Sequence, residues 1–166
     1  MSGVVGLSLA PELEPLAKLL RERKLSVAVA ESCTAGLLGA CLADLPGASG
    51  YFLGGFITYA TDTKASQLGV PDEVLSREGA VSAEVAGAMA ERAAREMGAD
   101  LALSITGVAG PETQEGKPVG LTYVGGWLRG RSQVEEHHFS GGRASNRLLA
   151  VEAALNLARR LLERPG

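Results

Sequence analysis

Short, almost uncharged apolar stretches alternate along the chain with longer amphipathic stretches, and this alternation limits the fold more than any other feature. Residues 25–30 (LSVAVA) and 101–107 (LALSITG) carry no charge and contain small and β-branched side chains. This composition is typical of strands buried on both faces of a sheet. The stretches between them repeat apolar residues every three or four positions, as helices that cover a sheet do. The pattern predicts an α/β fold, built as a three-layer α/β/α sandwich.

Further strands and the helices follow from the same reasoning. Residues 51–60 are another strand candidate, whose adjacent Gly54 and Gly55 suggest a bulge or a close backbone approach. Residues 121–130 and 132–140 form a predicted antiparallel hairpin, which makes the sheet mixed but mostly parallel. We expect helices over residues 11–24, 34–45, 62–71, 82–98 and 141–164.

The size and composition of the chain favour one soluble domain. Its 166 residues match the usual size of a domain, so we expect a single domain over residues 1–166. A net charge of −3 without a concentrated basic run argues against a nucleic-acid partner. No stretch has the roughly 18 apolar residues of a membrane span, and the first residues lack the basic start of a secretory signal. We therefore expect a cytoplasmic protein that binds neither nucleic acid nor membranes.

The cysteines and histidines do not indicate a metal site or a disulfide framework. Cys33 and Cys41 are the two cysteines, and they do not form a CxxC pair. His, Cys, Asp and Glu nowhere show a familiar metal-ligand spacing. We expect chemistry that needs neither a metal nor a cofactor.

Polar segments follow the predicted strands, and they carry the candidate chemistry. The four segments are ESCTAG (31–36), TYATDTK (58–64), SITGVAGP (104–111) and FSGGR (139–143). Ligands of open α/β sheets bind outside the carboxyl ends of the strands, so at least the first three segments should converge on one crevice. Each segment alone could be a helix cap or a glycine turn, whereas together they predict a functional site.

Ser32 is the strongest candidate for a nucleophile. It lies at a strand-to-helix turn, where free backbone N–H groups can hold an oxyanion. A serine hydroxyl needs a base, and the two adjacent histidines point to opposite faces of their strand. Lys64 is the alternative base if burial or a neighbouring cation lowers its pKa, although an ordinary solvated lysine is the commoner arrangement. Tyr59 could relay a proton or orient the lysine.

The other residues of ESCTAG have competing interpretations. Cys33 could replace Ser32 as the nucleophile, because a thiol at a helix N-terminus has a lowered pKa, or it could be a small buried packing residue. Glu31 could orient a polar substrate group or stabilise a cation. Thr34 is expected to cap the following helix and to lie among the substrate-binding residues.

Two glycine-containing loops could bind the substrate. The first contains Thr106, Gly107 and Gly110, whose backbone N–H groups could cradle a phosphate or a sugar. The second opens the last helix with Gly142, and Arg143 adds a planar cation suited to an anion. Arg147 lies one turn further on, so its guanidinium could share a face with that of Arg143. This second segment predicts phosphate binding.

In this order, the segments resemble the C-terminal domain of the CinA (competence/damage-inducible) family. The matching stretches include AESCTAGLL, GGFITYATDTKASQLGV, ITGVAGP, KPVGLTYVG and FSGGRASNR, and they span roughly residues 25–155. The resemblance implies an α/β/α sandwich and, for stand-alone members, hydrolysis of the carboxamide of nicotinamide mononucleotide (NMN) to nicotinate mononucleotide and ammonia.

The resemblance also implies roles for individual residues. It implies a serine nucleophile and a lysine base, which correspond to Ser32 and Lys64. Tyr59 and Thr106 match further active-site positions, and Arg143 matches the arginine that opens the final helix. A small pyridine nucleotide and a second copy of the chain, in a homodimer, are the partners expected by this analogy.

Two features depart from the family pattern, and two other functions stay open. Glu112 and Thr113 stand where family members often carry glycines, so closure over the substrate could differ. Longer members have an N-terminal nucleotide- or pterin-binding-like domain that these 166 residues do not include. The alternatives are a module that binds a nucleotide or a partner without turnover, and a hydrolase that uses Cys33.

Overall fold

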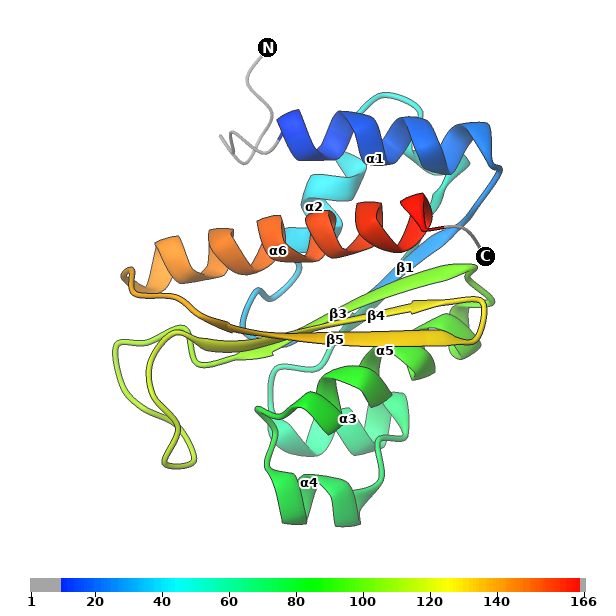
Figure 1. The fold of residues 1–166 in the computed structure, drawn as a ribbon. Helices are drawn as coiled ribbons and strands as arrows, with labels where there is room; N and C mark the ends of the chain where they lie inside the picture. Colours follow the sequence, from blue (N-terminus) through cyan, green and yellow to red (C-terminus); the bar gives the residue numbers. More distant parts are fainter. Residues whose placement is uncertain (1–9, 165–166) are drawn as a thin grey trace.

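The computed structural model describes residues 10–164 and confirms the three-layer α/β/α architecture (Figure 1). The strands are β1 (Val27–Glu31), β2 (Phe52–Ile57), β3 (Leu101–Gly107), β4 (Leu121–Leu128) and β5 (Arg131–His138). The helices are α1 (Ala10–Glu22), α2 (Leu37–Ala43), α3 (Thr61–Leu68), α4 (Asp72–Glu78), α5 (Ala83–Met97) and α6 (Arg143–Glu163), with a short 3₁₀ helix, η1 (Ala48–Gly50). No helix of the described residues is both long and apolar enough to cross a membrane.

The five strands form one mixed sheet in the order β2-β1-β3-β4-β5. Strand β1 lies between β2 and β3 and is parallel to both, whereas β4 is antiparallel to β3 and to β5. Because β5 opposes β4, it runs in the same direction as β3, and only β4 is reversed. The prediction of a mixed, mostly parallel sheet is confirmed. The carboxyl ends of β1, β2 and β3 therefore lie side by side at the same end of the sheet.

Helices cover both faces of the sheet (Figure 1). Helices α1, α2 and α6 lie over one face, and α3, α4 and α5 lie over the other. Strands β1 and β3 are buried along their whole length, which explains why their sequences contain continuous apolar runs. The side chains of these strands separate two aliphatic cores, one beneath α1 and α6 and one beneath α5.

The glycines of β2 permit the close approach that the sequence indicated. Gly54 has a φ of 124°, which favours glycine, and the pairing of β1 with β2 shifts register between Val27 and Ala28. A Cβ atom on Gly55 would lie 2.0 Å from the carbonyl oxygen of Val29. Any larger residue at position 55 would therefore push β2 away from β1.

Several helix boundaries follow directly from local sequence. Ser82 caps α5 as expected, because its side chain accepts a hydrogen bond from the backbone N–H of Val85. Gly69 and Gly98 end α3 and α5 in the left-handed conformation. Helix α2 is different, because it begins at Leu37 and not near Thr34.

Candidate active site

A pocket of ≈ 420 Å³ lies at the carboxyl ends of β1 and β3. All four polar segments singled out in the sequence contribute to its lining, so the predicted convergence is confirmed. The lining residues are Ser32, Cys33, Tyr59, Ala80, Val81, Thr106, Gly107, Val108, Ala109, Gly110, Pro111, Glu112, Thr113, Gln114 and Arg143.

Ser32 and Lys64 are in direct contact beneath this pocket. The Nζ atom of Lys64 lies 3.0 Å from Ser32 Oγ and 2.6 Å from the carbonyl oxygen of Thr58. Lys64 is completely buried, whereas Ser32 keeps 8% of its surface exposed and lines the pocket. The hydroxyl therefore faces the space that a substrate would fill, and the amine approaches it from the protein side.

The burial of Lys64 favours its neutral form. Removal of the amine from water lowers the pKa of Lys64 from its ordinary value of 10.5, and the nearby Cys33 and Glu115 oppose this shift only in part. None of the hydrogen-bond partners of Nζ is a carboxylate; they are a hydroxyl and a carbonyl oxygen. A neutral lysine at this distance can accept the Ser32 proton, which a charged one cannot.

The turn that carries Ser32 leaves backbone donors available. The N–H of Ser32 is used by the carbonyl oxygen of Ile105, and the turn continues through Ala35 and Gly36 with φ values of 49° and 96°. Within residues 10–164, the N–H groups of Cys33 and Thr34 donate to no other residue. Of the two residues, only Cys33 lines the pocket, so its N–H is the candidate donor for an oxyanion formed beside Ser32.

Glu31 holds this turn in place. Its carboxylate is fully buried and accepts hydrogen bonds from the backbone N–H groups of Gly36, Leu38 and Gly39, at 3.1, 3.0 and 2.8 Å. These are the free donors at the start of α2, so Glu31 caps this helix. The expectation that Thr34 caps it is wrong, because the Thr34 hydroxyl is buried without a hydrogen-bond partner in the described part of the chain. Neither Glu31 nor Thr34 lines the pocket.

Cys33 lines the pocket, but its environment suppresses thiolate formation. Burial raises the pKa of the Cys33 thiol to about 11, although its own backbone N–H and Arg147 act in the opposite direction. The residue also lies four positions before the start of α2, so the thiol is not at a helix N-terminus. The lowered pKa on which a cysteine nucleophile depends is therefore missing.

Arg143 and Tyr59 form one wall of the pocket. The Arg143 guanidinium donates from Nη1 to the carbonyl oxygen of Gly110 at 2.7 Å, and from Nη2 to the hydroxyl of Tyr59 at 2.9 Å. The Tyr59 hydroxyl is thus bound to Arg143, and only the backbone carbonyl of Tyr59 approaches Ser32 Oγ, at 3.5 Å. Tyr59 is 54% exposed, so its ring is accessible at the pocket.

Arg147 and Gly142, which the sequence placed beside Arg143, have structural roles. Arg147 does not share the face of Arg143, because it donates to the carbonyl oxygens of Cys33 and Thr34 at 3.0 and 2.9 Å. It thereby ties α6 to the Ser32 turn. Gly142 is the N-cap of α6 and does not line the pocket.

The remaining predicted residues lie at the end of β3. The Thr106 hydroxyl donates to the carbonyl oxygen of Ala80 at 2.7 Å. A Cβ atom on Gly107 would lie 2.6 Å from Thr122 Oγ1, so this position needs glycine for packing against β4. Gly110 has a φ of 101° and turns the chain along the pocket wall.

Sequence reasoning missed Glu115 and Lys117, which fasten the β3–β4 loop. The Glu115 carboxylate accepts hydrogen bonds from the N–H groups of Ala80 and Val81, at 2.9 and 3.4 Å. Lys117 Nζ donates to the carbonyl oxygens of Glu78 and Val81 and pairs with Glu115. We call this pair of residues the loop clamp. Only the KPVG motif, which begins with Lys117, hinted at this segment, and nothing local pointed to its contacts with the end of α4 and the connection between α4 and α5.

The titration of Glu115 agrees with this arrangement. Partial burial raises the pKa of the carboxyl, but the N–H groups of Ala80 and Val81 and the Lys117 ammonium outweigh it and hold the pKa below its ordinary value. In the described residues, no three His, Cys, Asp or Glu side chains gather as metal ligands.

Comparisons with known proteins agree with this geometry. A family model described as the CinA C-terminal domain matches residues 11–162. A competence-damage inducible protein of Desulforamulus reducens is 46% identical over 148 residues, which cover 88% of this chain and 36% of that protein. A CinA-like protein of Syntrophomonas wolfei is 45% identical over 168 residues, covering 98% of this chain and 39% of its own length. The chain thus spans well under half the length of these curated relatives.

Solved structures match along nearly their whole length. The competence/damage inducible protein CihA from Agrobacterium tumefaciens has a TM-score of 0.89 and 34% identity, with 94% of this chain and 96% of that chain covered. A CinA superfamily protein from Escherichia coli has a TM-score of 0.90 and 32% identity, with 93% and 90% covered. The match over residues 11–162 and these likenesses show that the chain belongs to the CinA family, through its C-terminal domain.

Proposed function

We propose that this protein is an amidohydrolase that converts NMN to nicotinate mononucleotide and ammonia. The observation that carries the proposal is the contact of 3.0 Å between Lys64 Nζ and Ser32 Oγ, with the lysine wholly buried and the serine at the pocket. A binding pocket has no need of a buried amine with a lowered pKa against a hydroxyl, whereas a nucleophile and its base require this arrangement.

The choice of substrate rests on the family resemblance together with the pocket. A volume of ≈ 420 Å³ is within the range of small-molecule sites. Arg143 supplies a cation at the pocket wall for the phosphate of a mononucleotide. The exposed Tyr59 ring offers an aromatic face beside it for a pyridine ring.

In the first half of the reaction, Ser32 Oγ attacks the carboxamide carbon while neutral Lys64 takes the hydroxyl proton. The carbonyl oxygen becomes an oxyanion, which the backbone N–H of Cys33 would stabilise. The C–N bond then breaks, and the Lys64 ammonium returns its proton to the departing nitrogen, so ammonia leaves. The product of this half is an ester between Ser32 and the nicotinoyl group.

In the second half, water attacks the ester carbon while neutral Lys64 takes a proton from it. The bond to Ser32 Oγ breaks, and the lysine returns the proton to the serine. The products are nicotinate mononucleotide and the free enzyme, so atoms and charges balance without a redox partner.

The test is ammonia release from NMN by purified protein, compared with nicotinamide riboside and nicotinamide. We expect turnover of NMN and a loss of kcat of at least about a thousandfold in Ser32→Ala and in Lys64→Ala. Ser66→Ala on α3 and Lys18→Ala on α1 are matched controls, because both side chains are exposed. Full activity in either active-site variant, with the controls intact, would rule out the assigned roles.

Iodoacetamide separates this proposal from a cysteine hydrolase. The raised pKa of Cys33, about 11, leaves almost no thiolate at pH 7.5, so alkylation should be slow. Cys33→Ser should keep most of the activity. Loss of all activity in Cys33→Ser, in a protein that still melts cooperatively, would favour the cysteine mechanism instead.

A further inference from the structure

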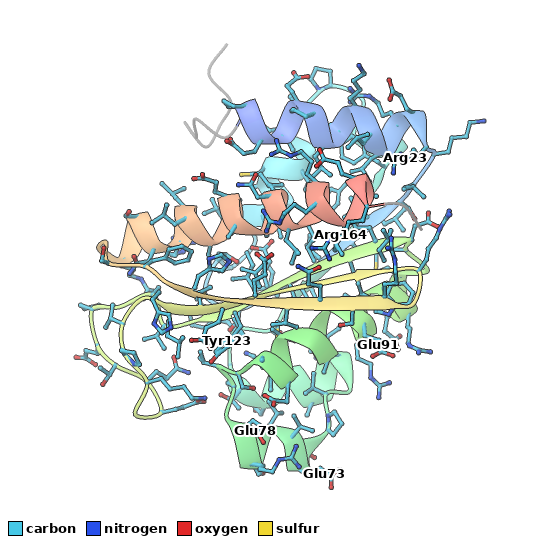
Figure 2. The ribbon with its side chains drawn as sticks, in the orientation of Figure 1. Arg23, Glu73, Glu78, Glu91, Tyr123 and Arg164 are labelled. Carbon is cyan, nitrogen blue, oxygen red and sulfur yellow. The ribbon has the colours of Figure 1, made fainter. Side chains whose placement is uncertain are left out.

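A second pocket, of ≈ 330 Å³, has a lining made of arginine and leucine. We call it the arginine pocket. Its lining residues are Arg23, Leu25, Leu128, Arg129, Arg131, Leu162 and Arg164. Figure 2 shows Arg23 and Arg164 at the same end of the molecule, near the C-terminal ends of α1 and α6.

The arginine pocket lies at the opposite end of the sheet from Ser32. Leu25 comes just before β1, whereas Ser32 follows it, so the strand separates the two sites. Helix α6 likewise begins with Arg143 at the active-site pocket and ends near Leu162 at the arginine pocket. The proposed hydrolysis uses none of the residues around the arginine pocket.

Three of the four guanidinium groups are anchored but keep free donors. Arg23 donates from Nη1 to the carbonyl oxygen of Leu162. Arg164 donates from Nη1 to Gln133 Oε1 at 2.9 Å. Arg129 contacts Asp100 through Nε at 3.0 Å and Nη2 at 2.9 Å. Each guanidinium carries five N–H donors, so each of the three keeps several of them for a ligand.

Among the described residues, the fourth guanidinium is unengaged, and no carboxylate is part of the pocket lining. Arg131 has no hydrogen-bond or salt-bridge partner within residues 10–164. Asp100 balances only Arg129, and at the ends of α1 and α6 the carboxylates of Glu22 and Glu163 already pair with Lys18 and Arg159. Counted over residues 10–164, four cations face one carboxylate, a local surplus of three positive charges in a chain whose net charge is −3.

Helix capping accounts for only part of this arrangement. An arginine near a helix C-terminus satisfies terminal carbonyls and complements the helix dipole, which accounts for Arg23. It does not account for Arg129 and Arg131, which lie on the β4–β5 hairpin. Guanidiniums gathered at one cavity repel one another unless an anion lies between them, and their forked donors match phosphate oxygens.

We propose that the arginine pocket binds an organic polyphosphate of the size of a nucleoside diphosphate. The phosphate groups would lie against the guanidiniums of Arg131, Arg164 and Arg23. The three leucines are only 2–6% exposed, so they form a small apolar floor against which a ring of the ligand packs. A single monovalent anion would leave most of the charge surplus uncompensated, which is why the ligand carries at least two phosphate groups.

Calorimetric titration with ADP, pyrophosphate and adenosine tests this proposal. We expect ADP to bind the full chain at one site, more tightly than pyrophosphate, with a Kd that rises steeply with salt. Adenosine should show no measurable binding. The double variant Arg131→Ala/Arg164→Ala should weaken ADP binding at least about tenfold, because it removes two of the exposed phosphate donors.

Two matched variants distinguish binding in the arginine pocket from binding at another place on the protein. Arg77→Ala/Arg95→Ala removes the same charge from exposed positions on α4 and α5, so it should leave ADP binding unchanged. Arg143→Ala should also leave it unchanged.

Binding that is lost in Arg143→Ala but kept in the arginine-pocket variant would place ADP in the Ser32 pocket and overturn the proposal. So would the absence of binding to the folded wild-type chain, and equal affinities for ADP and pyrophosphate would overturn the role of the leucines. None of these measurements depends on NMN turnover.

Discussion

At the scale of single residues, the site depends on how Lys64 and Glu31 are buried. The sequence placed Ser32 and Lys64 after two strands, but it could not tell a buried lysine from a solvated one. Burial is decided by the packing of α3 against the sheet, and α3 itself is only weakly amphipathic. Glu31 was misjudged for a related reason, because its role requires the chain to turn back so that α2 points its N–H groups at the carboxylate.

The pH dependence of NMN hydrolysis should report the environment of Lys64. The base must be neutral, so kcat/KM should rise with pH and level off above the pKa of the lysine. Because burial lowers this pKa, the midpoint should lie below 10.5, the ordinary value for lysine. Lys64→Arg should be inactive at every pH tested, since a guanidinium stays charged. A kcat/KM that does not rise with pH anywhere below 10.5, in protein that stays folded, would contradict the base role.

Replacing Glu31 by glutamine should destabilise the protein. The amide keeps one acceptor oxygen but directs an NH₂ group at backbone donors that the carboxylate now satisfies. We expect the free energy of unfolding, measured in urea, to fall by about 2–3 kcal/mol. Glu22→Gln on the exposed side of α1 should change it by less than about 0.5 kcal/mol. Equal effects of the two substitutions would show that the cap contributes little.

At the scale of elements, the β3–β4 loop is the part that sequence patterns predicted least. Its glycines and Pro111 indicated a loop, and the family resemblance indicated substrate contacts. The loop clamp, however, joins Glu115 and Lys117 to residues 78–81, more than thirty positions away. Such pairings depend on how α4 and α5 pack against the sheet, which local periodicity does not encode. The strands and long helices, by contrast, followed from patterns of apolar residues over short windows.

Breaking the loop clamp should loosen the pocket wall without removing the catalytic pair. In Lys117→Met, the carbonyl oxygens of Glu78 and Val81 lose their charged donor. We expect faster amide hydrogen exchange in residues 108–118 and a KM for NMN raised by about tenfold, with a smaller change in kcat. Lys18→Met is the control, because that lysine is exposed on α1. Unchanged exchange in the loop would mean that other contacts hold it.

At the scale of the whole molecule, the site is assembled from distant parts of the chain. Ser32 and Arg147 are more than one hundred residues apart, yet Arg147 bonds to the carbonyl oxygens of the two residues that follow Ser32. The mixed sheet and the three layers could be predicted because the hydrophobic patterns are strong. The strand order β2-β1-β3-β4-β5 came from tertiary packing, which places β1 between two strands that follow it in sequence.

This assembly predicts that activity and fold are lost together. In a urea titration, NMN hydrolysis and far-UV circular dichroism should decline with the same midpoint, within about 0.2 M, as a two-state transition requires. Loss of activity well before the loss of helical signal would show that the site opens while the sheet and α6 remain folded. A Ser32→Ala sample followed by circular dichroism alone serves as the control for stability.

The loop after β3 has two parts, one that lines the cavity and one that attaches the loop to the rest of the protein. Glu112, Thr113 and Gln114 line the cavity with exposed side chains, whereas the next residues attach the segment to the body of the protein. A protein engineer could therefore randomise these three positions to reach new substrates while the machinery beneath stays intact. For the same reason, substitutions at these three positions can change substrate preference during evolution with little effect on folding.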